Sequence, residues 1–101
     1  MSRIVRFEQI ARAEFAEAIA WYEEQRPGLG RQFESEISTV LNSICHAPEH
    51  FRRVSASVRK ARLRRFPSYS IYFTQATDLI AVVAVWHASR NPAVLGQRLK
   101  T

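Results

Sequence analysis

The residues best suited to chemistry are His87-Ala88-Ser89-Arg90, which directly follow a long apolar stretch. Histidine can accept and donate protons near neutral pH, and an arginine three residues later can hold a phosphate or a carboxylate. His87 and Arg90 are therefore candidates for a general base beside an anion clamp. The alternative is a histidine that satisfies backbone hydrogen-bonding groups where a strand ends.

A second candidate is a dense group of basic residues in the second half of the chain. A strand alternates its side chains, so a strand over Val58–Phe66 would place Lys60, Arg62 and Arg64 on one face. The remaining two strand arginines would lie on the other face. The whole group comprises Arg52, Arg53, Arg59, Lys60, Arg62, Arg64 and Arg65.

Aromatic residues follow this basic stretch and allow two interpretations. Phe66, Tyr69 and Tyr72 could stack on nucleic-acid bases. Alternatively they belong to the core, and the arginine side chains lie over them. Tyr69 has the same strand parity as Ile71 and Phe73, which favours the core.

Charge and composition narrow the class of protein. The 101 residues carry a net charge of +6, but residues 1–50 hold five Arg and eight Glu, net −3, whereas residues 51–101 hold ten Lys and Arg and one Asp, net +9. Such an imbalance favours a polyanion or an acidic protein as partner. No apolar run approaches the roughly 18–20 residues of a membrane-spanning helix. With no signal-peptide pattern and one cysteine, we expect a single cytoplasmic domain over residues 1–101.

The elements that position these residues are organised around Leu79–His87. Eight apolar residues precede the histidine and four of them are β-branched, which predicts a strand buried on both faces. Patterns of period two predict three more strands, and apolar residues at three- and four-residue spacing predict two helices. The strands are expected over Arg3–Phe7, Val58–Phe66 and Tyr69–Thr74, and the helices over Glu8–Gln25 and Leu29–His46.

These elements predict an α+β fold with the order β-α-α-β-β-β. Short turns favour an antiparallel meander for the last three strands, with the helical hairpin packed on one face of a twisted sheet. The helical pattern leaves Glu14 and Glu17 exposed. The other sheet face is expected to be partly open and to carry arginines. Asn91 and Pro92 are typical of the first positions of a helix.

Other chemistries find little support in the sequence. Cys45, His46 and His50 lie close together, but a metal site needs three or four convergent ligands and only Glu49 is near. A Ser/His/Asp triad is not expected, because Asp78 is the one aspartate and lies in a turn. We therefore expect no metal site and no cofactor.

Several short motifs, taken in their order and spacing, resemble the RelE/ParE superfamily of toxins from bacterial type II toxin–antitoxin systems. The resemblance covers residues from about Phe7 to Gln97 and implies a small twisted antiparallel sheet with a helical hairpin. The motifs are Trp21-Tyr22-Glu23, Pro27-Gly28-Leu29-Gly30 with Phe33, Pro48, Val58-Arg59, Arg64–Tyr69 and Val85–Pro92.

The superfamily divides by target. RelE-like members cut mRNA in the ribosome and share basic residues on the sheet and a C-terminal tyrosine, whereas ParE-like members act on DNA gyrase. Here Ser70 stands where the nuclease arginine is expected, and Val94-Leu95 stand where the tyrosine would fall. The resemblance therefore implies a ParE-like toxin that poisons DNA gyrase. A RelE-like ribosome-dependent mRNA endonuclease, with His87 and Arg90 as catalytic residues, is the alternative.

This interpretation carries expectations about partners. An exposed basic surface predicts neutralisation by a small, acidic, partly disordered antitoxin, and no membrane partner. A stand-alone nucleic-acid-binding module is the rival, and it predicts tight RNA or DNA binding with a steep salt dependence. The expected target-binding residues are Arg59, Lys60, Arg62, Arg64, Arg65 and Arg90.

Overall fold

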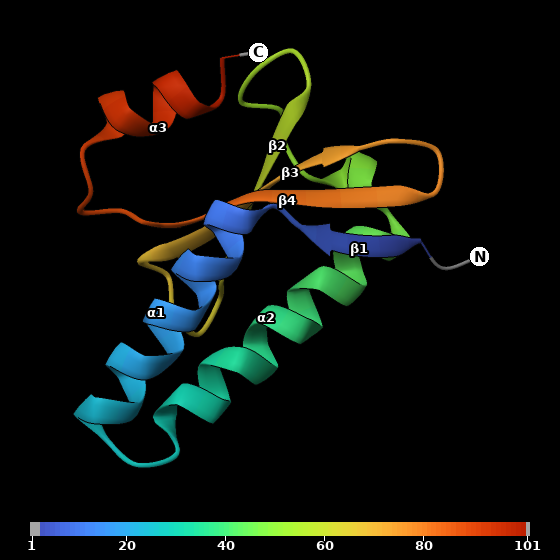
Figure 1. Cartoon of the computed structure of the whole chain (residues 1–101). Coiled ribbons are helices and arrows are strands. Elements are labelled where there is room, and N and C mark those ends of the chain that lie inside the picture. The colour runs from blue at the N-terminus through green and yellow to red at the C-terminus, as the bar shows by residue number, and fades with distance from the viewer. Residues whose placement is uncertain (1–2, 101) are drawn as a thin grey trace.

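A computed structural model describes residues 3–100 and contains a four-stranded sheet with helices on both faces (Figure 1). The order β-α-α-β-β-β is confirmed, and a third short helix follows it. The elements are β1 (Ile4–Phe7), α1 (Gln9–Gln25), α2 (Leu29–His46), the 3-10 turn η1 (Pro48–His50), β2 (Val58–Arg62), β3 (Tyr69–Gln75), β4 (Leu79–His87) and α3 (Pro92–Arg98).

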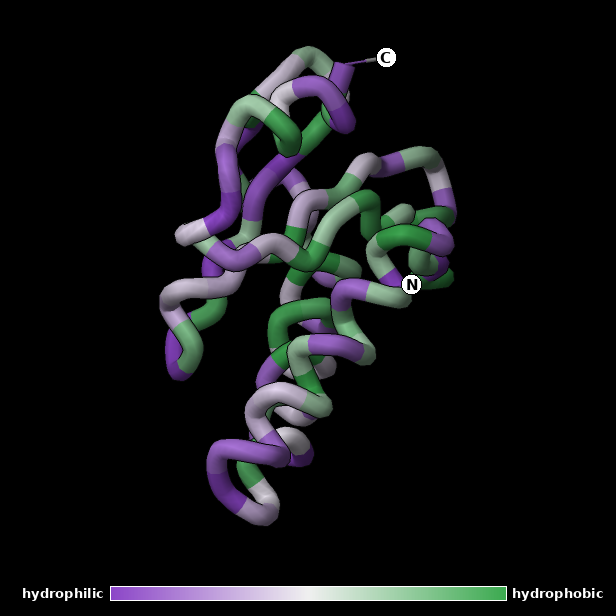
Figure 2. The backbone as a smooth tube through the Cα atoms, turned by 60° about the vertical axis from the view of Figure 1, so that its left-hand side comes forward, coloured by the Kyte–Doolittle hydropathy of each residue, from purple (hydrophilic) through white to green (hydrophobic). Residues whose placement is uncertain are grey.

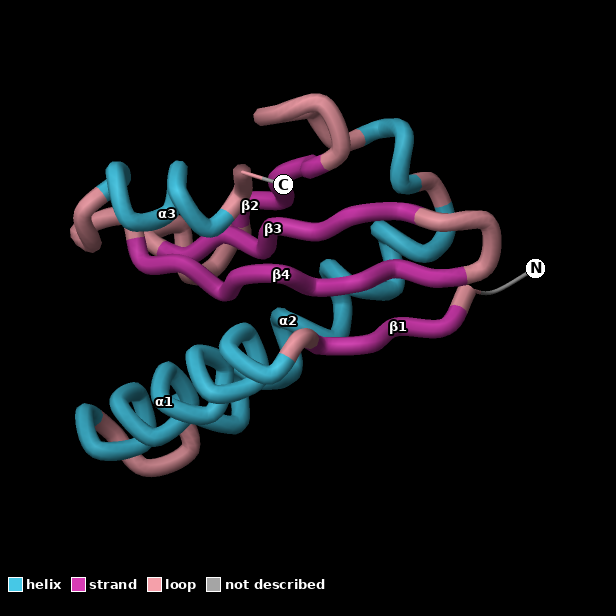
Figure 3. The backbone as a smooth tube through the Cα atoms, turned by 45° about the horizontal axis from the view of Figure 1, so that its top comes forward, coloured by secondary structure: helices cyan, strands magenta, loops and turns pink. Residues whose placement is uncertain are grey.

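The strands lie in the order β1-β4-β3-β2 (Figure 3). Strands β2, β3 and β4 form the antiparallel meander, as the short turns predict. Strand β1 pairs with β4 in parallel, with Ile4 opposite Leu79 and Phe7 opposite Val82. The apolar strand β4 therefore lies between two neighbours, and most of its side chains are buried.

The two sheet faces pack against different elements. Helices α1 and α2 cover one face, where Phe33, Ile71 and Val82 belong to the main core. Helix α3 lies against the other face, where Leu95 packs with Tyr72 and Trp86 (Figure 1). The second face, expected to be partly open, is thus partly covered by this short helix. Its N-terminus is capped as the sequence predicts, because the Asn91 side chain accepts the N–H of Ala93 at 2.9 Å.

The connection between α1 and α2 depends on two glycines. Gly28 has φ +90°, a left-handed conformation that side chains with a Cβ rarely adopt. The carboxylate of Glu23 accepts the N–H groups of Gly28 at 2.9 Å and of Gly30 at 3.0 Å. A Cβ on Gly30 would lie 2.6 Å from the carbonyl oxygen of Ile19, so the helices approach closely here. The hydrophilic colour of this hairpin tip in Figure 2 agrees with its position in solvent.

Two strands depart from their expected geometry. Strand β2 ends at Arg62 rather than at Phe66, because Glu36 on α2 accepts the backbone N–H groups of Arg64 and Arg65. These donors are therefore not part of the sheet ladder. In β4 a bulge shifts the register, so that Tyr72 is opposite Ala84 and Phe73 is opposite Val82. The residue between them, Val83, is only partly buried.

The contrast between two glycines tests the helix packing. Gly30→Ala should lower the free energy of unfolding by about 1–3 kcal/mol, because the methyl group forces α1 and α2 apart. Gly96→Ala, within α3, should raise it by up to about 1 kcal/mol, because nothing lies within 4 Å of the added Cβ and alanine favours helix. Urea unfolding measures both; shifts of the same sign would contradict the packing described.

Candidate functional site

Strand β1 pairs only with Leu79–Val82 of β4. Beyond Val82, side chains instead of a strand form hydrogen bonds with the backbone of this edge of β4. The carboxylate of Glu14, on α1, accepts the N–H of Val85 at 3.0 Å. The guanidinium of Arg98, on α3, donates to the carbonyl of Val83 at 2.7 Å and to Glu14 at 2.6 Å. One carboxylate therefore joins α1, β4 and α3.

Arg90 is the second arginine that binds the Glu14 carboxylate. Its Nη1 lies 2.6 Å from Oε2 of Glu14, and its guanidinium carbon lies 3.8 Å from the centroid of the Trp86 ring. Arg98 approaches the same ring at 5.4 Å. An ion pair and a cation–π contact thus hold Arg90, although its side chain is 44% exposed. The expected anion clamp is already bound by a carboxylate of the protein itself.

Glu14 is the residue of this site that sequence reasoning missed. The helical pattern predicts an exposed side chain, whereas the side chain is only 9% exposed. Burial on its own raises the pKa of Glu14, but hydrogen bonds from Arg98, Val85 and Arg90 outweigh it and hold the pKa below the ordinary value of 4.5. Its arginine partners lie 76 and 84 residues away in the sequence, so no local pattern signals the pairing.

His87 turns back onto its own backbone at the end of β4. Its Nδ1 accepts the N–H of Ser89 at 3.0 Å and lies 2.8 Å from the Ser89 hydroxyl. The neutral ring therefore carries its proton on Nε2. The ring also meets Tyr69 edge to face, with centroids 5.0 Å apart. This geometry matches the alternative in which the histidine satisfies a backbone group.

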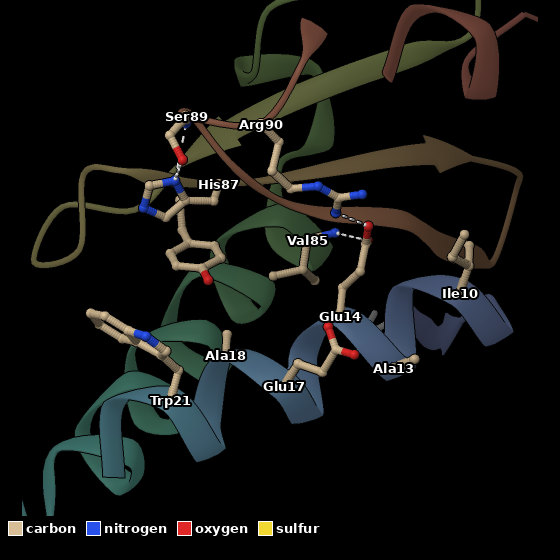
Figure 4. Close-up of a pocket in the computed structure, with 11 residues that line it drawn as sticks. Ile10, Ala13, Glu14, Glu17, Ala18, Trp21, Val85, His87, Ser89 and Arg90 are labelled. Carbon is tan, nitrogen blue, oxygen red and sulfur yellow. Dashed lines mark hydrogen bonds and ion pairs between the residues drawn. The ribbon is translucent and has the colours of Figure 1, made fainter. Parts of the chain in front are cut away.

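A groove runs between the outward side of α1 and the end of β4 (Figure 4). Its volume is about 630 Å³. Tyr69 lies in this groove. The pKa of Tyr69 is raised above the ordinary value of 10.0, mainly by burial and secondly by the neighbouring Tyr22. The Tyr69 hydroxyl therefore stays protonated at neutral pH. The groove is lined by Ile10, Ala13, Glu14, Glu17, Ala18, Trp21, Tyr69, Val85, His87, Ser89 and Arg90.

The basic residues expected to act together lie in separate places. Lys60 and Arg62 belong to β2, at the sheet edge opposite β1, and β3 separates them from β4, whose end Arg90 follows. Lys60 lies over the ring of Tyr72 at 5.8 Å, and the Arg62 Nε donates to the carbonyl of Pro67. Arg59 points to the other face and donates to the carbonyl of Phe51 at 2.6 Å.

Arg64 and Arg65 lie in the loop after β2. Both are exposed, and their backbone N–H groups bind Glu36 of α2. The guanidinium of Arg65 also donates to the Gln32 side chain at 2.7 Å. Arg64 and Arg65 therefore lie beside α2 rather than on the strand face that Lys60 occupies.

The aromatic side chains near the basic residues belong to the core. Phe66 and Tyr72 are each 7% exposed, on opposite sides of the sheet. Tyr69 packs edge to face on Phe33 of the main core, with centroids 5.1 Å apart. These rings therefore do not form an exposed platform on which bases could stack.

The cysteine and histidine group at the end of α2 forms a surface hollow. Cys45, His46 and His50 line it, together with parts of the following turn. Among residues 3–100, no group of three or more His, Cys, Asp and Glu side chains is arranged to hold a metal ion. In the same part of the chain, every helix is too short or too polar to cross a membrane.

Comparison with known proteins identifies the family. A family model described as "ParE toxin of type II toxin-antitoxin system, parDE" matches residues 5–92. The chain therefore belongs to the ParE toxin family, within the RelE/ParE superfamily that its motifs resemble. No curated protein sequence matches it.

Solved structures agree at the level of fold. A chain of the chromosomal ParDE TA system from P. aeruginosa superposes with a TM-score of 0.73 at 13% identity, covering 87% of this chain and 98% of the other. A mutant of the E. coli toxin RelE in the free state superposes with a TM-score of 0.55 at 13% identity, covering 98% of this chain and 99% of the other. At such low identity, the agreement concerns the arrangement of helices and strands.

The hydrogen bonds and ion pairs of Glu14 predict how the stability of the fold depends on this carboxylate and on pH. Glu14→Gln leaves Arg90 and Arg98 without their carboxylate and should lower the free energy of unfolding at neutral pH by on the order of 2 kcal/mol. Because the folded-state pKa of Glu14 lies below 4.5, this stabilisation is present above pH 4.5 and is lost as the pH falls through the folded-state pKa. The difference between wild type and variant, measured by urea unfolding, should therefore shrink in acid.

Glu17→Gln is the matched control. Glu17 is exposed on the same helix and makes no ion pair with any residue of the described chain. Its replacement should leave the stability at neutral pH nearly unchanged. Equal losses in the two variants would show that Glu14 does not have the role assigned to it.

Proposed function

We propose that this ParE-family protein is a toxin that inhibits growth by binding and poisoning DNA gyrase. The observation that carries the proposal is the state of Arg90: it is held by Glu14 and Trp86, and His87 is turned onto Ser89. An acid–base nuclease needs proton-transferring groups on both sides of a bound phosphate. Here the lysine and arginines of β2 are separated from β4 and its exit by strand β3. This arrangement suits a surface that binds a target better than it suits a catalytic site.

The proposed target surface uses basic residues that keep solvent access. Arg62 and Arg64 are exposed, and Arg90 remains 44% exposed beside its carboxylate. Arginines of this kind often dominate protein interfaces, since their fixed fork of donors meets carboxylates and backbone carbonyls. Lys60, Arg59 and Arg65 complete the proposed set, and each also contacts another part of the protein.

We also propose that a cognate antitoxin neutralises this toxin. The family is defined by a toxin–antitoxin pair, and the half of the chain from residue 51 carries a net charge of +9. A small acidic protein encoded next to the toxin gene fits that charge. RelE-like ribosome-dependent mRNA cleavage is the second candidate function, supported by the shared fold with RelE and by His87 and Arg90 at the strand exit.

Two assays run side by side separate these functions. The wild-type protein should inhibit gyrase supercoiling and leave ribosome-bound mRNA intact. Arg90→Ala should weaken gyrase inhibition about 30-fold, since an arginine at an interface centre is worth about 2 kcal/mol. His87→Ala should change inhibition little.

Arg31→Ala provides the control for charge. It removes one exposed arginine from α2, outside the proposed surface, and should inhibit gyrase as the wild type does. Thermal unfolding checks that each variant is folded. Specific mRNA cleavage by the wild type that is lost in a folded His87→Ala variant would overturn the gyrase proposal and favour the nuclease.

A further inference from the structure

Two arginines lie directly opposite each other at the outer edge of the sheet. Arg53, in the segment before β2, forms an isolated antiparallel bridge with Arg59 of β2. The backbone hydrogen bonds of this bridge lie on either side of the two residues, which are therefore a non-hydrogen-bonded pair. Side chains approach most closely in such pairs, and like charges directly opposite each other destabilise a sheet. An anion bound between the two guanidinium groups would remove this repulsion.

The pair lies at the end of the sheet away from the groove beside α1. Strand β3 begins at Tyr69, which is opposite His87, and ends at Gln75. The two arginines and Gln75 line a hollow of about 230 Å³, together with Ala56 and Ser57. This volume is below the roughly 300–1,000 Å³ of pockets for drug-sized molecules and suits a small anion.

Each arginine is oriented by one hydrogen bond to the backbone. Nη1 of Arg59 donates to the carbonyl of Phe51 at 2.6 Å, and Nη1 of Arg53 donates to the carbonyl of Ala56 at 3.2 Å. Their other guanidinium nitrogens and the Ser57 hydroxyl make no hydrogen bond to residues 3–100. Two oriented guanidinium forks beside a hydroxyl suit the oxygens of a phosphate group.

The hollow contains no carboxylate that could neutralise the arginines. No acidic side chain lines it, and residues 51–77 hold seven Lys and Arg but no Asp or Glu. Both ion pairs within residues 3–100 are made by Glu14, with other arginines. Such an uncompensated positive field favours an anion supplied from outside the chain.

We propose that Arg53 and Arg59 together bind one phosphate of a duplex DNA backbone. Arg53 is exposed and Arg59 is half-buried, so a polymer can reach the hollow at the sheet edge. The nearby rings of Phe66 and Tyr72 are buried, which leaves no platform for unpaired bases and favours a duplex over a single strand. The choice of DNA rests on the proposed function, because DNA is the substrate of gyrase.

The toxin alone, without gyrase, tests this site. Fluorescence anisotropy measures its binding to a labelled DNA duplex at several salt concentrations. Phosphate contacts give sequence-independent binding that weakens as salt rises, and we expect a Kd of about 10⁻⁶–10⁻⁴ M at physiological salt. This affinity is well below the tight binding expected of a stand-alone nucleic-acid-binding module.

Single and double variants test whether the two arginines share a phosphate. Arg53→Gln and Arg59→Gln should each weaken DNA binding about tenfold at low salt and lower the slope of log Kd against log salt by about 1. The double variant should also lower the slope by about 1, because one phosphate contact is lost in all three cases. Arg31→Gln removes an exposed arginine of α2 and should bind as the wild type does.

Inorganic phosphate distinguishes a small free anion from the polymer. Phosphate should raise the Tm of the wild type and of Arg31→Gln above that in chloride at equal ionic strength, and should raise the Tm of Arg53→Gln less. The unfolding curves in chloride also show which variants fold. Arg53 is exposed, so Arg53→Gln provides the test even where Arg59→Gln does not fold.

Several results would overturn the site. These are unchanged salt slopes in Arg53→Gln and Arg59→Gln, an equal change in Arg31→Gln, and a double variant whose slope falls by about 2. Stabilisation by phosphate without DNA binding would overturn the assignment to DNA, as would tighter binding of an RNA duplex of the same sequence.

The site and the proposed target can fail separately. A toxin that binds DNA through Arg53 and Arg59 but does not inhibit gyrase overturns the target and keeps the phosphate site. A toxin that inhibits gyrase but does not bind DNA keeps the target and overturns the phosphate site.

Discussion

The uncovered edge of β4 is the constraint on which the rest of the site depends. Strand β1 is only four residues long, so the backbone of β4 beyond Val82 needs other partners. An unpaired strand edge invites association with other chains, and its polar groups cost free energy if they are buried unpaired. Glu14 and Arg98 resolve both problems, since they bind Val85 and Val83 and bind each other. The same bonds fix the position of α3 against the sheet.

Local signals in the sequence determine most of the fold. Helix α2 has the bounds expected from its apolar spacing, with glycine before it and Pro48 after it. The period-two pattern of β3 places Ile71 and Phe73 in the main core and Tyr72 on the opposite face, as expected. These features could be predicted because each depends on residues within a few positions along the chain.

The candidate site could not be predicted in the same way, because its bonds join distant segments. Glu14 has the spacing of a solvent-exposed residue, and only the folded chain brings Arg90 and Arg98 to it. The end of β2 has a similar cause, since Glu36 of α2 binds the backbone of the loop after the strand. In both cases a carboxylate on a helix accepts backbone N–H groups of a distant segment. Periodicity along one element carries no signal of such bonds.

Arg90 connects the structural cluster with the proposed interfaces. Glu14 and Trp86 set its orientation before any partner arrives, so little side-chain entropy remains to be lost on binding. The groove beside α1 includes the same arginine, whereas Arg62 and Arg64 lie outside it. Any partner bound in that groove would therefore contact an arginine of the proposed target surface.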